Sequence, residues 1–115
     1  MTDPVSPAKE PPVELELPDG VVQAEQSVEL IRAFIADGAL MVSLNADAFG
    51  DRVQDWGRLL SEIAEHIAKA AALQGFATEG EAEAVIRQTF TASALVTPQQ
   101  PRTHSSEGKI RRTRH

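Results

Sequence analysis

A histidine and two glutamates lie close together in the stretch SEIAEHIAK, residues 61–69. On a helix, residues four apart share a face, so Glu62 and His66 would stand side by side. Helical zinc sites need two histidines and a glutamate, ordered H-E-x-x-H or H-x-x-E-H. The second histidine is missing, because the other two, His104 and His115, lie near the C-terminus. The pattern favours a solvated helix face, with a weak metal or small-ligand site at Glu62 and His66 as the alternative.

The acidic stretch NADAFGDRVQDW, residues 45–56, partly matches a calcium-binding loop. Such a loop needs an oxygen ligand at its fifth position and a bidentate glutamate at its twelfth. Here these positions hold Phe49 and Trp56, so three ligand oxygens are lost. We interpret the stretch as a turn in which Asp51 caps the following helix. Weak cation binding by Asp47 and Asp51 is the alternative.

The inventory of catalytic side chains is small. The chain has no cysteine and no tyrosine, and only one of its three histidines lies outside the C-terminal region. Neither a glycine-rich phosphate loop nor a nucleophile elbow is present. Catalysis usually draws on a cluster of such groups in a cleft. We therefore expect no enzymatic activity, no catalytic residue, no cofactor and no metal.

The two ends of the chain differ in composition from its middle. Residues 1–12 contain four prolines, and residues 97–115 contain one large apolar residue, Ile110. Neither end can bury enough surface to offset the entropy of ordering it, so we expect both to be disordered. Residues 13–96 then form a single compact domain. A core of this size gives modest stability, which a partner subunit would increase.

The charge is unevenly distributed. The chain has a net charge of −6, but residues 102–115 carry five Lys and Arg against one Glu. This basic tail would be attracted to nucleic acid, and equally to the acidic remainder of its own chain or of a second copy. We favour the second reading, with a nucleic-acid accessory role as the alternative. The candidate contacts for nucleic acid are Lys109, Arg111, Arg112 and Arg114.

The chain has no apolar run that would serve as a signal peptide or a membrane helix. The absence of cysteine fits a reducing compartment. We therefore expect a soluble cytoplasmic protein with no membrane partner.

The hydrophobic pattern predicts five elements. Apolar residues alternate with glutamates at 13–18, as in a strand with one buried face, and 39–44 is a short apolar strand. Helical spacing covers 24–37, where Gly38 would provide the C-terminal cap, and 52–74. A third helix opens at a capping box, Thr78 with Glu81.

These elements predict a small two-layer α/β (or α+β) domain. The expected order is strand–helix–strand–helix–helix, with a short sheet packed on the helices and a disordered tail at each end. Two strands leave two open edges, which favour pairing with another chain. We therefore expect a homodimer or another protein–protein interaction module. The candidate interface residues are Leu15, Leu17, Val42 and Trp56.

The segment from Ile31 to Leu44, the pair Trp56–Gly57 and the histidine at position 66 resemble a family of small bacterial proteins known only as a domain of unknown function. The resemblance covers about residues 14–92 and leaves out both ends. It implies a compact α+β or α/β domain of bacterial origin. It implies no activity, cofactor or site residue.

Overall fold

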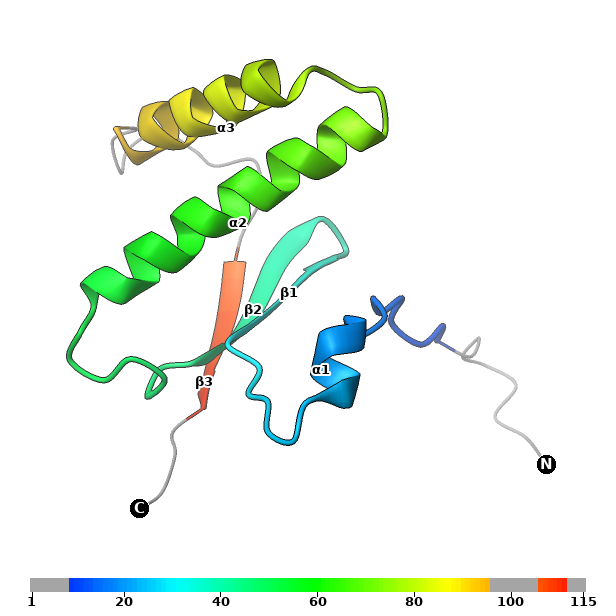
Figure 1. The fold of residues 1–115 in the computed structure, drawn as a ribbon. Helices are drawn as coiled ribbons and strands as arrows, with labels where there is room; N and C mark the ends of the chain where they lie inside the picture. The colour runs from blue at the N-terminus through cyan, green and yellow to red at the C-terminus, as the bar shows by residue number, and fades with distance from the viewer. Residues whose placement is uncertain (1–8, 96–105, 112–115) are drawn as a thin grey trace.

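The computed structural model describes residues 9–95 and 106–111. A three-stranded sheet lies beside a helical hairpin, with one short helix apart from both (Figure 1). The α+β class expected from the sequence is confirmed, but the order of the elements differs. In chain order they are α1 (Asp19–Gln23), β1 (Ile31–Ala36), β2 (Ala39–Asn45), α2 (Gln54–Leu73), α3 (Glu79–Ala94) and β3 (Ser106–Arg111).

Strands β1 and β2 form an antiparallel hairpin around Asp37 and Gly38, whose φ angles are 50° and 80°. Positive φ at both central residues is the geometry of the two-residue turn that matches strand twist, and Asp-Gly is one of its preferred pairs. The predicted helix over 24–37 is therefore wrong. Ile31, Phe34 and Ile35 have helical spacing, but the turn that follows them pairs this segment with β2.

Strand β2 is the centre of the sheet, because β3 pairs with its other side in parallel. The expectation that residues 39–44 form an open edge is thus wrong, and so is the assignment of Ser106–Arg111 to a disordered tail. The segment 13–18 is also not a strand, since it forms no ladder with β1. Its short length allows few ladder hydrogen bonds, and helix α1 follows it directly.

Helices α2 and α3, both expected from the sequence, pack against each other, and two of their boundaries have a local cause. Gly75, at φ 77°, ends α2, with Phe76 N–H donating to the Ala71 carbonyl at 3.0 Å. Thr78 and Glu81 form the predicted capping box at the start of α3. The predicted cap by Asp51 is wrong, because Val53 precedes α2 and makes no side-chain cap.

The two helices pack through small side chains. Ala68 on α2 is 0% exposed and Ala82 on α3 is 6% exposed, and no other apolar residue within residues 9–95 is buried. Cα atoms of different elements approach within 8 Å between β1 and β2, between β2 and β3, and between α2 and α3. The sheet and the helical hairpin are therefore each packed mainly within themselves.

The capping box gives a first prediction, on the stability of α3. Thr78 Oγ1 accepts from the Glu81 N–H at 3.1 Å, and Glu81 Oε1 accepts from the Thr78 N–H at 3.2 Å. Replacing Thr78 by Ala removes this hydroxyl and should lower the free energy of unfolding in urea by about 1 kcal/mol. Thr78→Ser keeps the hydroxyl and is the matched control. Equal losses in the two variants would mean that the cap contributes nothing.

The same box gives a prediction on pH. The Thr78 hydroxyl, which also donates to Glu81 Oε1 at 2.9 Å, lowers the pKa of that carboxyl below its ordinary 4.5. Since the pKa is lower in the folded state, the stabilisation is present above about pH 4.5 and is lost as the pH falls through the folded value. Glu81→Gln should therefore lose less stability than the natural chain on acidification. Identical pH profiles, measured by urea unfolding, would contradict this.

Candidate functional site

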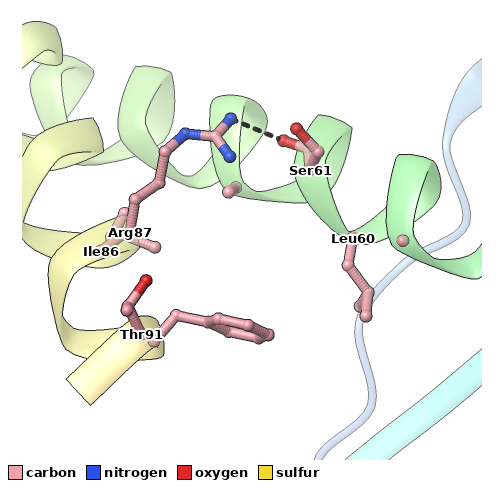
Figure 2. A pocket seen from close by; sticks show the side chains of 8 residues that line it. Leu60, Ser61, Ile86, Arg87 and Thr91 are labelled. Carbon is pink, nitrogen blue, oxygen red and sulfur yellow. Dashed lines mark hydrogen bonds between the residues drawn. The ribbon is translucent and has the colours of Figure 1, made fainter. Parts of the chain in front are cut away.

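The best-defined hollow on the described surface is a groove of about 360 Å³ between α2 and α3. One wall is formed by Gly57, Leu60 and Ala64 of α2. The other is formed by residues 86–91 of α3, among which Ile86, Phe90 and Thr91 line the groove. Figure 2 shows Leu60 and Thr91 facing the open space from the two helices. The groove is apolar along most of its length.

Arg87 closes one end of this groove and joins the two helices. Its Nη2 donates to the Ser61 carbonyl oxygen on α2 at 3.2 Å (Figure 2). Its Nε donates to Glu83 at 3.0 Å on its own helix, and Glu65 of α2 lies 3.9 Å away. Two carboxylates and a carbonyl thus surround the guanidinium, which fixes the spacing of α2 and α3.

Large apolar side chains around the groove are exposed. Leu60 keeps 44% of its surface accessible and Phe90 keeps 66%. Ile86 and Phe90 also line a second, flatter hollow on α3, together with Val85. The two hollows form one continuous apolar surface over the helical hairpin, a property typical of surfaces that bind another protein.

The residues predicted as an interface do not form one surface. Leu15 and Leu17 are exposed and line a hollow against β1. Val42 lies opposite Ala33 within the sheet and is half-buried. Trp56 is half-buried at the start of α2, with its ring 5.1 Å from that of Phe49 at an angle of 82°. That edge-to-face contact fits an anchor of the loop before α2.

The segment around Leu15 is held to β1 by charge. Arg32 of β1 pairs with Glu29 at 3.1 Å and with Glu14 at 2.9 Å. The hydrogen bond and the charge of Glu29, and the charge of Glu14, raise the pKa of Arg32 above its ordinary value. All three side chains are largely exposed, so these pairs position the segment without adding much stability.

Neither predicted alternative for a metal acquires a third ligand. No group of three or more His, Asp or Glu side chains in the described segments is arranged to hold a metal ion. His66 is exposed on α2, and Asp47 and Asp51 lie in the turns before that helix. The geometry therefore adds no support for a metal site at Glu62 and His66 or at Asp47 and Asp51.

Of the four residues predicted to contact nucleic acid, two lie in β3 and two do not. Lys109 and Arg111 lie in β3, in register with Ser43 and Asn45 of β2. Arg112 and Arg114 lie outside the described residues. Whether any of the four contacts nucleic acid stays a prediction.

Sequence reasoning missed the groove residues Gly57, Phe90 and Arg87. The signal for Phe90 was present, since its spacing from Ile86 is that of one helix face, but that spacing does not show that Phe90 is exposed. Gly57 was conspicuous as a glycine inside a predicted helix. The position of Arg87 depends on how α2 and α3 pack, which the sequence alone does not specify.

Comparisons with known proteins found a matching family and a similar solved structure. The profile of the family described as "Domain of unknown function (DUF5076)" matches residues 14–96, which confirms the resemblance to an uncharacterised family. A solved structure described as "Structure of a putative pyruvate dehydrogenase from the photosynthetic bacterium Rhodopseudomonas palustrus CGA009" is similar, with 33% identity and a TM-score of 0.61. The match covers 84% of this chain and 96% of that one. No curated protein matches. In the part of the chain that the structure describes, no helix is both long and apolar enough to cross a membrane.

The contacts of Arg87 give a prediction on the helical hairpin. Arg87→Met keeps much of the apolar stem but removes the bond to Ser61, and should lower the free energy of unfolding by about 1 kcal/mol. Arg58→Met is the control, because Arg58 pairs only with Asp55 within α2 and should change stability by less than about 0.5 kcal/mol. Both are measured by urea unfolding. Equal changes would mean that Arg87 does not hold the helices together.

Proposed function

Because the chain belongs to the family described as "Domain of unknown function (DUF5076)", we propose its function from its structure. The chain is a non-enzymatic protein–protein interaction module that forms a homodimer. Its mechanism is the burial of apolar surface, with no bond chemistry.

One observation carries this proposal. Within residues 9–95, sixteen large apolar residues are exposed, whereas Ala68 and Ala82 are the only apolar residues that are buried. Hydrophobic burial is the main favourable contribution to folding, and domains ordinarily bury several large side chains completely. A chain that leaves so many exposed gains a core by association. The continuous surface over the helical hairpin is the best-formed place for it.

The magnitudes are consistent with a dimer. Complete burial of a Leu, Val or Phe side chain contributes about 1.5–3 kcal/mol. Leu60, Val85 and Phe90 from each of two copies would together contribute on the order of 10 kcal/mol, since each starts partly covered. Association costs about 4–15 kcal/mol in lost translational and rotational freedom. The free energy from burying the hairpin surface is therefore comparable to the cost of association. Additional contacts set the affinity.

An enzymatic alternative comes from the description of the similar structure, which names a pyruvate dehydrogenase. Three features of the sequence argue against catalysis. The chain has no cysteine, no tyrosine and only three histidines. Turnover of pyruvate by the purified chain, lost on a substitution within the chain, would contradict the non-enzymatic proposal.

The location of the interface is tested with three variants, whose molar masses are measured by light scattering. Phe90→Asp places a charge on the hairpin surface and should convert the dimer to a monomer. Phe76→Asp is the matched control, because Phe76 is also exposed but lies in the connection between α2 and α3. Leu15→Lys tests the segment beside β1. A dimer that survives Phe90→Asp but not Leu15→Lys would place the interface at the sheet.

A further inference from the structure

The face of α2 that borders the groove carries an apolar stripe whose large members stay exposed. Its members recur at alternating spacings of four and three residues, the repeat of a helix that packs lengthwise on another helix. Val53, Leu60 and Ile67 keep 67%, 44% and 50% of their surfaces exposed. The contact with α3 uses the neighbouring positions Ser61 and Ala68 instead. The stripe comprises Val53, Gly57, Leu60, Ala64, Ile67 and Ala71.

Gly57 has no structural reason within its own chain to be glycine. A glycine inside a helix is less favourable than alanine by about 0.8–1 kcal/mol. A Cβ placed at Gly57 would meet no atom within 4 Å, so neither close packing nor backbone strain requires the missing side chain. The residue lines the groove beside Leu60. An external group that approaches the backbone of α2 would give this glycine a role.

We infer that the occupant of this groove is α2 of a second copy, packed antiparallel about a two-fold axis level with Glu62. In that register each large stripe residue meets a small one. Ile67 faces Gly57 of the second copy, and Leu60 faces its Ala64. Val53 and Ala71 match in the same way at the ends of the stripe. The inference rests on the proposed homodimer and specifies its surface and register.

The parallel alternative fits less well. There each stripe residue would meet its own copy, so Gly57 would face Gly57 and Ala64 would face Ala64. Such layers leave voids, which cost stability in proportion to their volume. The antiparallel register fills them and aligns the helix dipoles favourably, and the stripe itself carries no charge.

The area of this contact is sufficient. A helix of 20 residues is about 30 Å long. A strip of that length and about 20 Å wide, spanning α2 and the adjoining wall of α3, presents on the order of 600 Å² per copy. Two such faces reach about 1,200 Å², the lower end of stable protein interfaces. Ile86 and Phe90 of α3 would flank the inserted helix as side walls.

The test is a size exchange between positions 57 and 67. Gly57→Leu fills space that is empty in the single chain, so the variant should fold and its melting temperature at high dilution should not fall. In the dimer the new side chain would collide with Ile67 of the second copy, and the dissociation constant should rise by about tenfold or more. Adding Ile67→Ala restores the large-to-small match and should recover the affinity. Leu73→Ala, on the exposed end of α2, is the control and should have no effect.

The outcomes separate this inference from the proposed function. Dissociation by Gly57→Leu with recovery in the double variant supports the antiparallel α2 register. A Gly57→Leu chain that remains a dimer of unchanged affinity overturns the register, and leaves the homodimer itself standing. A double variant that stays dissociated also overturns it, because the two positions would then not face each other. A natural chain that is monomeric at all concentrations overturns both.

Discussion

The close contact of α2 and α3 through alanine is the constraint on which the rest of the structure depends. Ala68 and Ala82 let the two helix backbones approach, and Arg87 holds them there by bonding the Ser61 carbonyl. A contact between small side chains leaves the larger ones on the outer surfaces. Leu60 and Phe90 therefore border an open groove instead of filling a core. The exposed surface of the chain follows from how its helices pack.

This arrangement explains why a folded chain carries so much apolar surface. In most domains a sheet covers the apolar face of its helices and a single core results. Here sheet and hairpin are packed mainly within themselves, and no large side chain within residues 9–95 is fully buried. The chain forms well-defined secondary structure by local means, namely the Asp37–Gly38 turn, the Gly75 terminus and the Thr78–Glu81 box. Association then provides the burial that the tertiary structure lacks.

Local signals were predicted well from the sequence, and non-local ones were not. The end of α2 and the start of α3 follow from Gly75 and the capping box, whose effects act within a few residues. Strand β1 was mistaken for a helix because Ile31, Phe34 and Ile35 satisfy both patterns over so short a segment. Only the pairing of this segment with β2 shows that it is a strand and not a helix. Strand β3 was missed for the same reason, since its polar sequence acquires strand structure by pairing with β2.

Only part of the candidate site could be predicted from the sequence. The apolar spacing of α2 predicted a helix, but periodicity reports which residues are apolar and not which neighbour covers them. Leu15 was chosen as part of a predicted strand with an open edge, while the roles of Gly57 and Phe90 required the position of α3 to be known. A groove between two helices depends on their separation, and that separation depends on contacts such as Ala68 with α3 that sequence spacing does not reveal.

The most direct test of the account is the molar mass of the unsubstituted chain in solution, measured by light scattering over a concentration series. The account predicts a mass of twice the 12.4 kDa chain at high concentration, falling towards one chain on dilution. A mass of one chain throughout would contradict it. The apolar surface of the helical hairpin would then require a different protein as its partner.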